Sequence, residues 1–149
     1  MRYFKSKDEA QDALQDGFVK VFTKIENFRG HGSLEGWIRR IMVNTSLNLL
    51  RNNLKHAFHA DVDDEKVHIV DSSVDYDRFQ VDDIMKLIQN LPKGYRIIFN
   101  MYEIDGYAHK EIAQKLNISI NTSKSQLLKA RRHLRNELEL LHKVRQLPQ

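Results

Sequence analysis

The feature that most constrains this chain is a pair of short helical patterns joined by a tight turn, within about residues 91–138. Two helices that cross closely need a small residue in the first helix, a turn residue that tolerates positive φ, and a cap on the second helix. Ala113 is the small residue, and Asn117 follows four positions later with a side chain that tolerates left-handed geometry. Ser119 or Asn121 can cap the second helix. The pattern predicts a helix-turn-helix.

Apolar residues recur at helical spacing around this turn. A stripe over 81–91 ends at Pro92 and Gly94, and a further helix then runs until Asp105-Gly106 stops it. Residues 109–116 form a short helix, and the last helix runs from about Thr122 to about Leu141. The stripe consists of Val81, Ile84, Leu87, Ile88 and Leu91. The residues expected to be buried in the later helices are Ile97, Ile98, Met101, Tyr102, Ile112, Leu116, Ile118, Leu127 and Leu134.

The last helix has a polar outward face that combines cations with shorter polar side chains. Cations suit phosphates, shorter polar groups suit base edges, and the helix N-terminus adds attraction for a phosphate. An exposed basic helix face is more often simply solvated, but its conjunction with the turn and the cap favours binding to double-stranded DNA. The candidate DNA-binding residues are Asn121, Thr122, Lys124, Ser125, Lys129 and Arg132.

Charge is distributed in three blocks. Residues 1–60 carry ten basic and six acidic side chains, 61–83 carry two and nine, and 84–149 carry twelve and five. The acidic block has little apolar periodicity, so we interpret 57–82 as a linker between two basic domains, 1–56 and 83–143. A solvated loop is the simplest interpretation of this linker; the alternative is that it repels DNA or mimics it against one of the basic domains.

The N-terminal half also has helical periodicity. Phe18, Val21, Phe22, Ile25 and Phe28 share one face of a first helix, and the glycines of residues 29–33 interrupt the pattern. Ser33 can cap a second helix, extending to about Asn53, with Leu34, Trp37, Ile38, Ile41 and Met42 turned inward. No segment alternates as a strand would. The fold class is therefore all-α, with two small helical domains joined by an acidic linker.

Several classes of protein are excluded or disfavoured. The chain has no cysteine, no apolar run long enough for a membrane span, and no apolar stretch typical of a signal peptide at its start. We therefore expect a cytoplasmic protein without membrane insertion. No phosphate loop or nucleophile motif is present, so we predict neither an enzyme nor a cofactor. His56 and His59 near Asp61 and Asp63 are weak evidence for a metal site, and none is predicted.

Two sets of motifs resemble one known family. The segments that resemble sigma region 4 are Leu91-Pro92-Lys93-Gly94-Tyr95-Arg96-Ile97-Ile98-Phe99, Glu103-Ile104-Asp105-Gly106-Tyr107, Lys110-Glu111-Ile112-Ala113, Asn121-Thr122-Ser123-Lys124-Ser125 and Lys129-Ala130-Arg131. The segments and residues that resemble sigma region 2 are Asp8-Glu9-Ala10-Gln11-Asp12, Gln15-Asp16, Phe18, Phe28-Arg29-Gly30, Leu34, Trp37-Ile38, Ile41 and Asn44. The chain thus resembles bacterial RNA polymerase sigma factors of the sigma-70 superfamily, extracytoplasmic-function (ECF) type, whose region 4 is a winged-helix-like helix-turn-helix.

The resemblance implies an alternative sigma factor, a specificity subunit that directs core RNA polymerase to promoter DNA. Its first domain would bind the polymerase clamp helices and open the −10 element, and its second would dock in the major groove of the −35 element. The implied polymerase-binding residues are Asp12, Gln15, Asp16 and Phe18. The implied −10 residues are Asn27, Phe28, Arg29, His31, Arg40, Asn44, Asn48 and Arg51, with Gly30 in the loop and Trp37 beside the melted strand. An anti-sigma factor is a further partner that the family implies.

Other interpretations compete with some of these roles. Trp37 shares a stripe with Leu34 and Ile41, and we expect Trp37, Phe18 and Phe28 to pack mainly in the core. Members of the family usually carry one more helix upstream, so region 2 is expected to be truncated. An apolar residue is usual at Ser123, whose hydroxyl is expected to weaken packing slightly. A helix-turn-helix regulator that acts without core polymerase is the alternative function, although it would not explain the first sixty residues.

Overall fold

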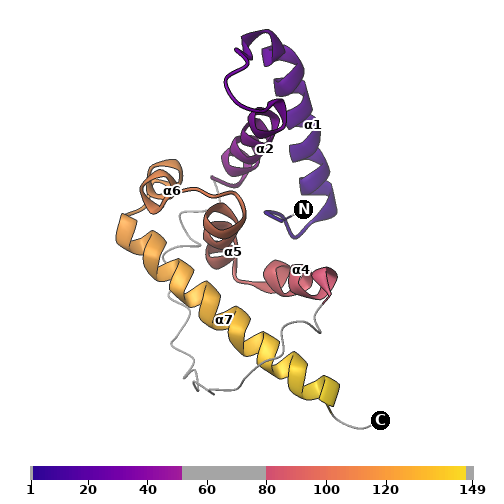
Figure 1. Cartoon of the computed structure of the whole chain (residues 1–149), viewed down its shortest axis with the longest axis vertical. Helices are drawn as coiled ribbons and strands as arrows, with labels where there is room; N and C mark the ends of the chain where they lie inside the picture. The colour runs from indigo at the N-terminus through magenta and orange to yellow at the C-terminus, as the bar shows by residue number, and fades with distance from the viewer. Residues whose placement is uncertain (1, 52–79, 147–149) are drawn as a thin grey trace. The chain divides into compact units, whose positions relative to one another are not determined.

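The computed structural model describes residues 2–51 and 80–146 of the chain (Figure 1). The chain divides into two compact units, one holding the N-terminal helices and the other the C-terminal helices. Every regular element in the described ranges is helical, which confirms the all-α prediction. None of the described helices is both long enough and apolar enough to cross a membrane. The predicted linker, 57–82, lies almost entirely outside the described residues, and its last two residues belong to a helix.

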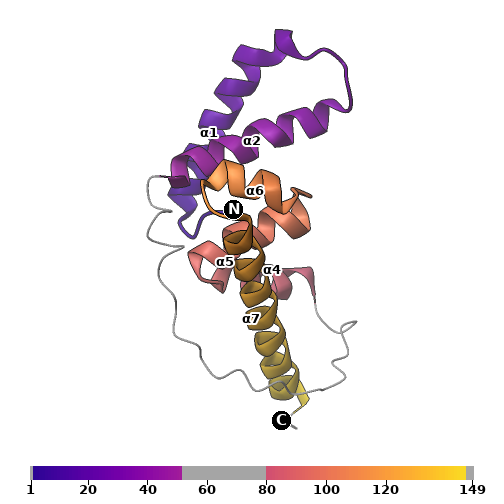
Figure 2. The same cartoon turned by 90° about the vertical axis from the view of Figure 1, so that its left-hand side faces the viewer.

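The first unit is a helical hairpin of α1 (Lys7–Lys24), the short 3₁₀ helix η1 (Ile25–Asn27) and α2 (Leu34–Arg51) (Figure 2). Ser6 caps α1, since its hydroxyl accepts from the Glu9 amide at 3.5 Å. The predicted cap on α2 is confirmed, because the Ser33 Oγ accepts from the Gly36 amide at 3.0 Å. Both helices begin where a side chain satisfies an otherwise unpaired backbone N–H.

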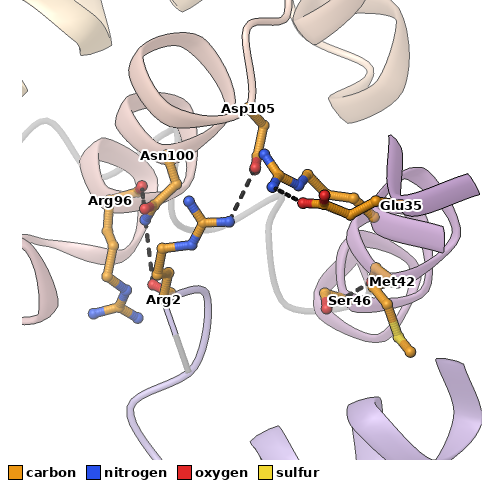
Figure 3. A network of polar contacts seen from close by, with 8 residues as sticks. Arg2, Glu35, Met42, Ser46, Arg96, Asn100 and Asp105 are labelled. Carbon is orange, nitrogen blue, oxygen red and sulfur yellow. Dashed lines mark hydrogen bonds and ion pairs between the residues drawn. The ribbon is translucent and has the colours of Figure 1, made fainter. Parts of the chain in front are cut away.

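Small side chains set the contact between α1 and α2. The buried residues of α1 are Ala13, Gly17 and Val21, spaced four apart. A Cβ on Gly17 would lie 2.2 Å from the Met42 Sδ, so only glycine admits this methionine at its present position. On α2, the Ser46 hydroxyl donates to the Met42 carbonyl at 3.0 Å (Figure 3). The two helices therefore approach closely along a narrow seam.

The expected burial of Phe18 and Leu34 is wrong, whereas that of the other inward residues of α2 holds in part. Of the α1 stripe only Val21 is buried; Phe18 is 45% exposed and Phe22 74%. The apolar arc of α1 is wider than the seam, and α2 covers only the part with the smaller side chains. On α2, Leu34 is exposed, whereas Trp37, Ile38, Ile41 and Met42 are half-buried. The fully buried α2 residues lie further along the helix, at Val43, Thr45, Leu47 and Leu50.

The second unit packs three shorter helices against one long one (Figure 1). Its elements are α4 (Val81–Asn90), α5 (Lys93–Phe99), the π-helical turn η3 (Asn100–Ile104), α6 (His109–Leu116) and α7 (Ile120–Gln146). The predicted burial is confirmed at Ile97, Ile98, Met101, Ile112, Leu116, Leu127 and Leu134, whereas Tyr102 and Ile118 are half-buried. Of the 81–91 stripe, Ile88 and Leu91 are buried, but Val81 and Ile84 are exposed, because the first turns of α4 extend beyond the core.

A buried arginine joins α4 to α5. Arg96 is 3% exposed, and its Nη1 donates to the Gln89 carbonyl at 2.8 Å and to the Leu91 carbonyl at 3.2 Å. These carbonyls lie at the C-terminal end of α4, where a positive charge is favourable. The Asn100 Nδ2 donates to the Arg96 carbonyl at 2.8 Å (Figure 3). Nothing in the sequence around Arg96 distinguishes it from the surface cations.

Candidate nucleic-acid interface

The turn between α6 and α7 has the predicted geometry. Asn117 adopts the left-handed conformation at φ 55°, and its amide donates to the Ala113 carbonyl. The Ile118 amide donates to the same carbonyl at 3.0 Å, which completes the end of α6. Ser119 is the cap on α7, because its Oγ accepts from the Thr122 amide at 2.9 Å. Asn121, the alternative cap, lies inside the helix.

The start of α6 is held by a carboxylate. The Glu111 side chain accepts from the Ala108 amide at 2.9 Å, which satisfies a backbone donor at the helix N-terminus. At the other end of the turn, the hydroxyls of Ser119 and Thr122 lie 2.8 Å apart. A side chain thus holds the N-terminal end of each helix of the motif.

The outward face of α7 holds the residues predicted to bind DNA. Asn121, Lys124, Ser125 and Arg132 are exposed, whereas Thr122 and Lys129 are half-buried at the edge of this face. The opposite face is buried and consists of Ser123, Gln126, Leu127, Ala130 and Leu134. Exposed cations and short polar groups on one rigid helix provide the two kinds of contact that DNA recognition uses.

Ser123 is fully buried, and a histidine pairs with it. The Ser123 hydroxyl lies 2.9 Å from the Nδ1 of His109, the first residue of α6. The His109 ring also stacks on Tyr102, with the ring centroids 4.5 Å apart. A polar pair therefore links the two helices of the motif where an apolar contact is usual, and the expected loss of packing at Ser123 is offset by a hydrogen bond.

The surroundings of His109 disfavour its charged form. Desolvation by burial lowers the His109 pKa, and the positive charges of Lys124 and Arg131 lower it further. The imidazole is therefore neutral near pH 7, and its Nδ1 can accept the hydrogen of the Ser123 hydroxyl. No local sequence pattern indicates this contact, since its two partners lie fourteen residues apart on separate helices.

Arg131 is engaged within the unit. Its Nε donates to the Glu103 Oε1 at 2.7 Å, and its Nη2 lies 2.6 Å from the same oxygen. Its guanidinium also lies 5.8 Å from the centroid of the Tyr102 ring. Arg131 thus ties the middle of α7 to η3, and although it lies nearly in line with Lys124 along the helix, its guanidinium is already paired with Glu103.

In the first unit, one face of α2 and the preceding loop carry the predicted −10 residues. Arg40, Asn44, Asn48 and Arg51 recur at intervals of three or four and so share one side of α2. Arg40, Asn48 and Arg51 are exposed, and Asn44 is half-buried. Asn27, Arg29 and His31 are exposed in η1 and the loop after it.

Two aromatic rings, one before this loop and one after it, lie against each other. Phe28 and Trp37 are both half-buried, with ring centroids 5.6 Å apart and the rings tilted by 54°. Gly30 and Gly32 have positive φ, at 72° and 89°, which the loop needs to reverse direction within a few residues. The packing prediction for Phe28 and Trp37 thus holds in part, since each ring retains an exposed portion.

The predicted polymerase-binding residues lie on the outside of α1. Asp12, Gln15, Asp16 and Phe18 are all exposed. Phe18 was expected in the core; it is instead beside Phe22, with ring centroids 6.5 Å apart. Exposed carboxylates and exposed aromatic rings are both groups that can contact another protein.

No cluster of three or more metal-binding side chains occurs among the residues that the structure describes. The sequence positions considered for a metal, His56, His59, Asp61 and Asp63, lie outside those residues. Nothing in the described geometry therefore adds to the weak metal pattern of the sequence.

Comparison with protein families finds two matches, in chain order. The model of Sigma-70 region 2 matches residues 1–55, and the model of Sigma-70, region 4 matches residues 82–134. The first covers the α1–α2 hairpin and the second covers α4 to the middle of α7. The helix-turn-helix and the hairpin therefore each fall within a separate matched region.

Curated relatives align along nearly the whole chain. The ECF RNA polymerase sigma-E factor of Haemophilus influenzae is 24% identical over 149 residues, covering 93% of this chain and 79% of the relative. The ECF RNA polymerase sigma-E factor of Escherichia coli (strain K12) is 26% identical over 153 residues, covering 94% and 78%. Since each alignment covers 93% or more of this chain, it extends across both matched regions.

A solved structure has a similar fold. It is the co-crystal structure of the sigma factor RpoE in complex with the anti-sigma factor NepR from Bartonella quintana, with a TM-score of 0.56 and 24% sequence identity. The match covers 93% of this chain and 86% of that chain. The all-helical, two-unit architecture is thus one already seen in an experimental structure.

Proposed function

The chain belongs to the sigma-70 family as an alternative sigma factor of the ECF type, and from that premise we propose how its two units divide promoter recognition. The first unit binds core RNA polymerase and the melted −10 element, and the second binds the −35 element. The observation that carries this proposal is the helix-turn-helix whose outward face exposes Asn121, Lys124, Ser125 and Arg132. As a specificity subunit the chain needs no catalytic site of its own.

At the −35 element, α7 enters the major groove. Lys124, Lys129 and Arg132 neutralise phosphates, and Asn121, Thr122 and Ser125 face base edges or the sugar-phosphate backbone. The packing of α7 supports this orientation, because Ala130 and Ser123 on its other side are completely buried. With that side occupied by the core, DNA can reach only the polar side of the helix.

At the −10 element, the melted strand follows the polar face of α2. Arg40 and Arg51 attract its phosphates, and Asn44 and Asn48 offer donors and acceptors to unpaired bases. The loop of Asn27, Phe28, Arg29 and His31 receives a flipped base, for which the partly exposed Phe28 and Trp37 rings offer a stacking surface. The exposure of these polar side chains supports the proposal.

Two protein partners complete it. The exposed Asp12, Gln15, Asp16 and Phe18 of α1 bind the clamp helices of core polymerase, and we propose that the chain acts in the cytoplasm with that enzyme. We also propose an anti-sigma factor as a regulator, since the similar RpoE structure was solved with one bound.

The test is assembly followed by DNA selection. The full chain is mixed with core polymerase, the complex is isolated by gel filtration, and randomised promoter duplexes are selected with the complex and with the free chain. We expect co-elution and an enriched pair of elements at a fixed spacing, selected by the complex. Specific selection by the free chain, without co-elution, would instead identify a regulator that acts without polymerase.

A further inference from the structure

One apolar side chain stands in the middle of the polar face of α7. Leu128 is 60% exposed, although it lies within the helix-turn-helix and beside a packed core. At about 100° per residue, Leu128 points about 160° away from Ala130, which is completely buried. Its side chain is thus directed almost straight out from the face proposed to enter DNA.

The neighbours of Leu128 on this face are all polar. Lys124 lies one turn before it and Arg132 one turn after it, and both are exposed. Ser125 and Arg131 lie at a spacing of three on either side, both exposed, and Arg131 is ion-paired with Glu103. The other strongly exposed leucine on the same helix is Leu140, 56% exposed and three turns further on. Leu128 is therefore a single exposed apolar side chain among charged and polar neighbours. It is not part of a larger apolar patch of the kind that a protein partner would cover.

The major groove offers an apolar group that fits such a point. Thymine is distinguished there by its C5-methyl group, which apolar side chains contact. Cations one turn to either side of Leu128 would hold the helix by the phosphates that flank the groove, leaving the leucine between them at the base edges. Leu128 lies about 10 Å along the axis from Asn121, within the part of a recognition helix that a groove can accommodate.

We propose that Leu128 determines specificity by packing on the C5-methyl group of a thymine in the −35 element. This rests on the proposed function and adds to it one base preference and the residue that imposes it. The contact removes both the leucine and the methyl group from water, and it forms only at a T·A pair, since cytosine and the purines present no methyl group at this place.

The test removes the methyl group from DNA and the side chain from the protein. Holoenzyme is reconstituted from core polymerase and the full chain, and its −35 site is found by selection. Each thymine of that site is then replaced singly by deoxyuridine, which retains the base pair without the methyl group. Dissociation constants are measured for the wild-type chain, Leu128→Ala and the matched control Leu140→Ala, which trims an equally exposed leucine outside the proposed interface.

We expect one thymine whose replacement weakens binding about fourfold for the wild-type chain and for Leu140→Ala, the usual effect of losing one buried methyl group. Leu128→Ala should bind thymine and deoxyuridine equally at that position. Equal affinity of the wild-type chain for both bases at every position overturns the proposal, as does a selected site without a T·A pair. An equal loss in wild-type and Leu128→Ala chains also overturns it, because another residue then reads the methyl group.

These results separate the proposal from the function on which it rests. Specific selection of a −35 site that is insensitive to deoxyuridine removes the role of Leu128 and leaves the sigma-factor function intact. Failure of the holoenzyme to select any −35 site removes both.

Discussion

Among single residues, Lys124 on α7 and His109 on α6 link the face proposed to bind DNA with the packing inside the unit. Lys124 is exposed on the outward side of α7, and its charge contributes to the lowered pKa of His109 on α6. His109 in turn lies within hydrogen-bonding distance of the buried Ser123. The cation that we propose to bind phosphate and the histidine that pairs with Ser123 therefore influence each other electrostatically.

Lys124→Ala should weaken binding to −35 DNA and reduce its salt dependence. A lysine that neutralises one phosphate releases about one counterion, so the slope of log affinity against log salt should fall in magnitude by about one. The measurement is a salt titration of DNA binding by holoenzyme. Lys143→Ala, an exposed lysine about five turns further along α7, is the control and should retain the full slope. The same slope for Lys124→Ala would exclude this lysine from the interface.

His109 should titrate below its ordinary value of about 6.5, because its pKa is lowered in the folded chain. The unfolded chain then binds more protons, so the free energy of unfolding rises with pH up to about 6.5 and is lost as pH falls toward the lowered pKa. NMR titration of the imidazole gives the pKa, and urea unfolding at pH 5 and pH 7.5 gives the stability change.

A double substitution isolates the contribution of His109 to the pH dependence of stability. His109→Phe with Ser123→Ala replaces both polar partners by apolar ones and retains an aromatic ring to stack on Tyr102. We expect the double variant to lose less stability between pH 7.5 and pH 5 than the wild-type chain. A His109 pKa above 6.5 would contradict the electrostatic account.

At the scale of elements, the turn and the caps follow from local sequence, whereas burial does not. Asn117, Ser33 and Ser119 occupy the predicted conformations and caps because these features depend on a few adjacent residues. Burial depends on which neighbour covers a helix face. Phe18 and Phe22 share one face of α1, as their spacing predicts, yet both are exposed because α2 does not cover that part of the helix.

In the candidate site too, features that depend on adjacent residues could be predicted from the sequence, whereas contacts between elements could not. The outward positions of α7 could be predicted from helical spacing, given a start near residue 120. Leu128 was missed because an isolated apolar residue in a helix is usually assigned to the core. The Arg96 contacts with α4 and the Arg131–Glu103 pair join different elements, so no local pattern signals them.

The turn itself can be tested at Asn117, which has φ 55°. Asn117→Ala should lower the free energy of unfolding by about 1 kcal/mol, since a Cβ disfavours left-handed geometry and alanine lacks the local hydrogen bonding of asparagine. Asn117→Gly removes the Cβ and should stay close to the wild-type value. Urea unfolding measures both. Alanine as stable as glycine would mean that the left-handed turn is not required.

For the whole molecule, the proposal assigns protein binding and −35 binding to different units. Reversing the charges of Asp12 and Asp16 to lysine should lower the affinity of the chain for core polymerase at least tenfold, because both carboxylates lie on the exposed side of α1. Glu9→Lys, also exposed on α1, is the matched control. Fluorescence anisotropy with labelled chain measures the affinity, and unchanged binding by the double variant would move the polymerase contact elsewhere.

The central claim is that this one chain gives core polymerase its choice of promoter through both units. Run-off transcription tests it most directly, with core polymerase and the full chain on a selected promoter and on versions with the −10 or the −35 element scrambled. We predict a defined transcript that requires the chain, loses most of its yield when either element is scrambled, and is absent with core polymerase alone. A transcript pattern identical with and without the chain would contradict the account.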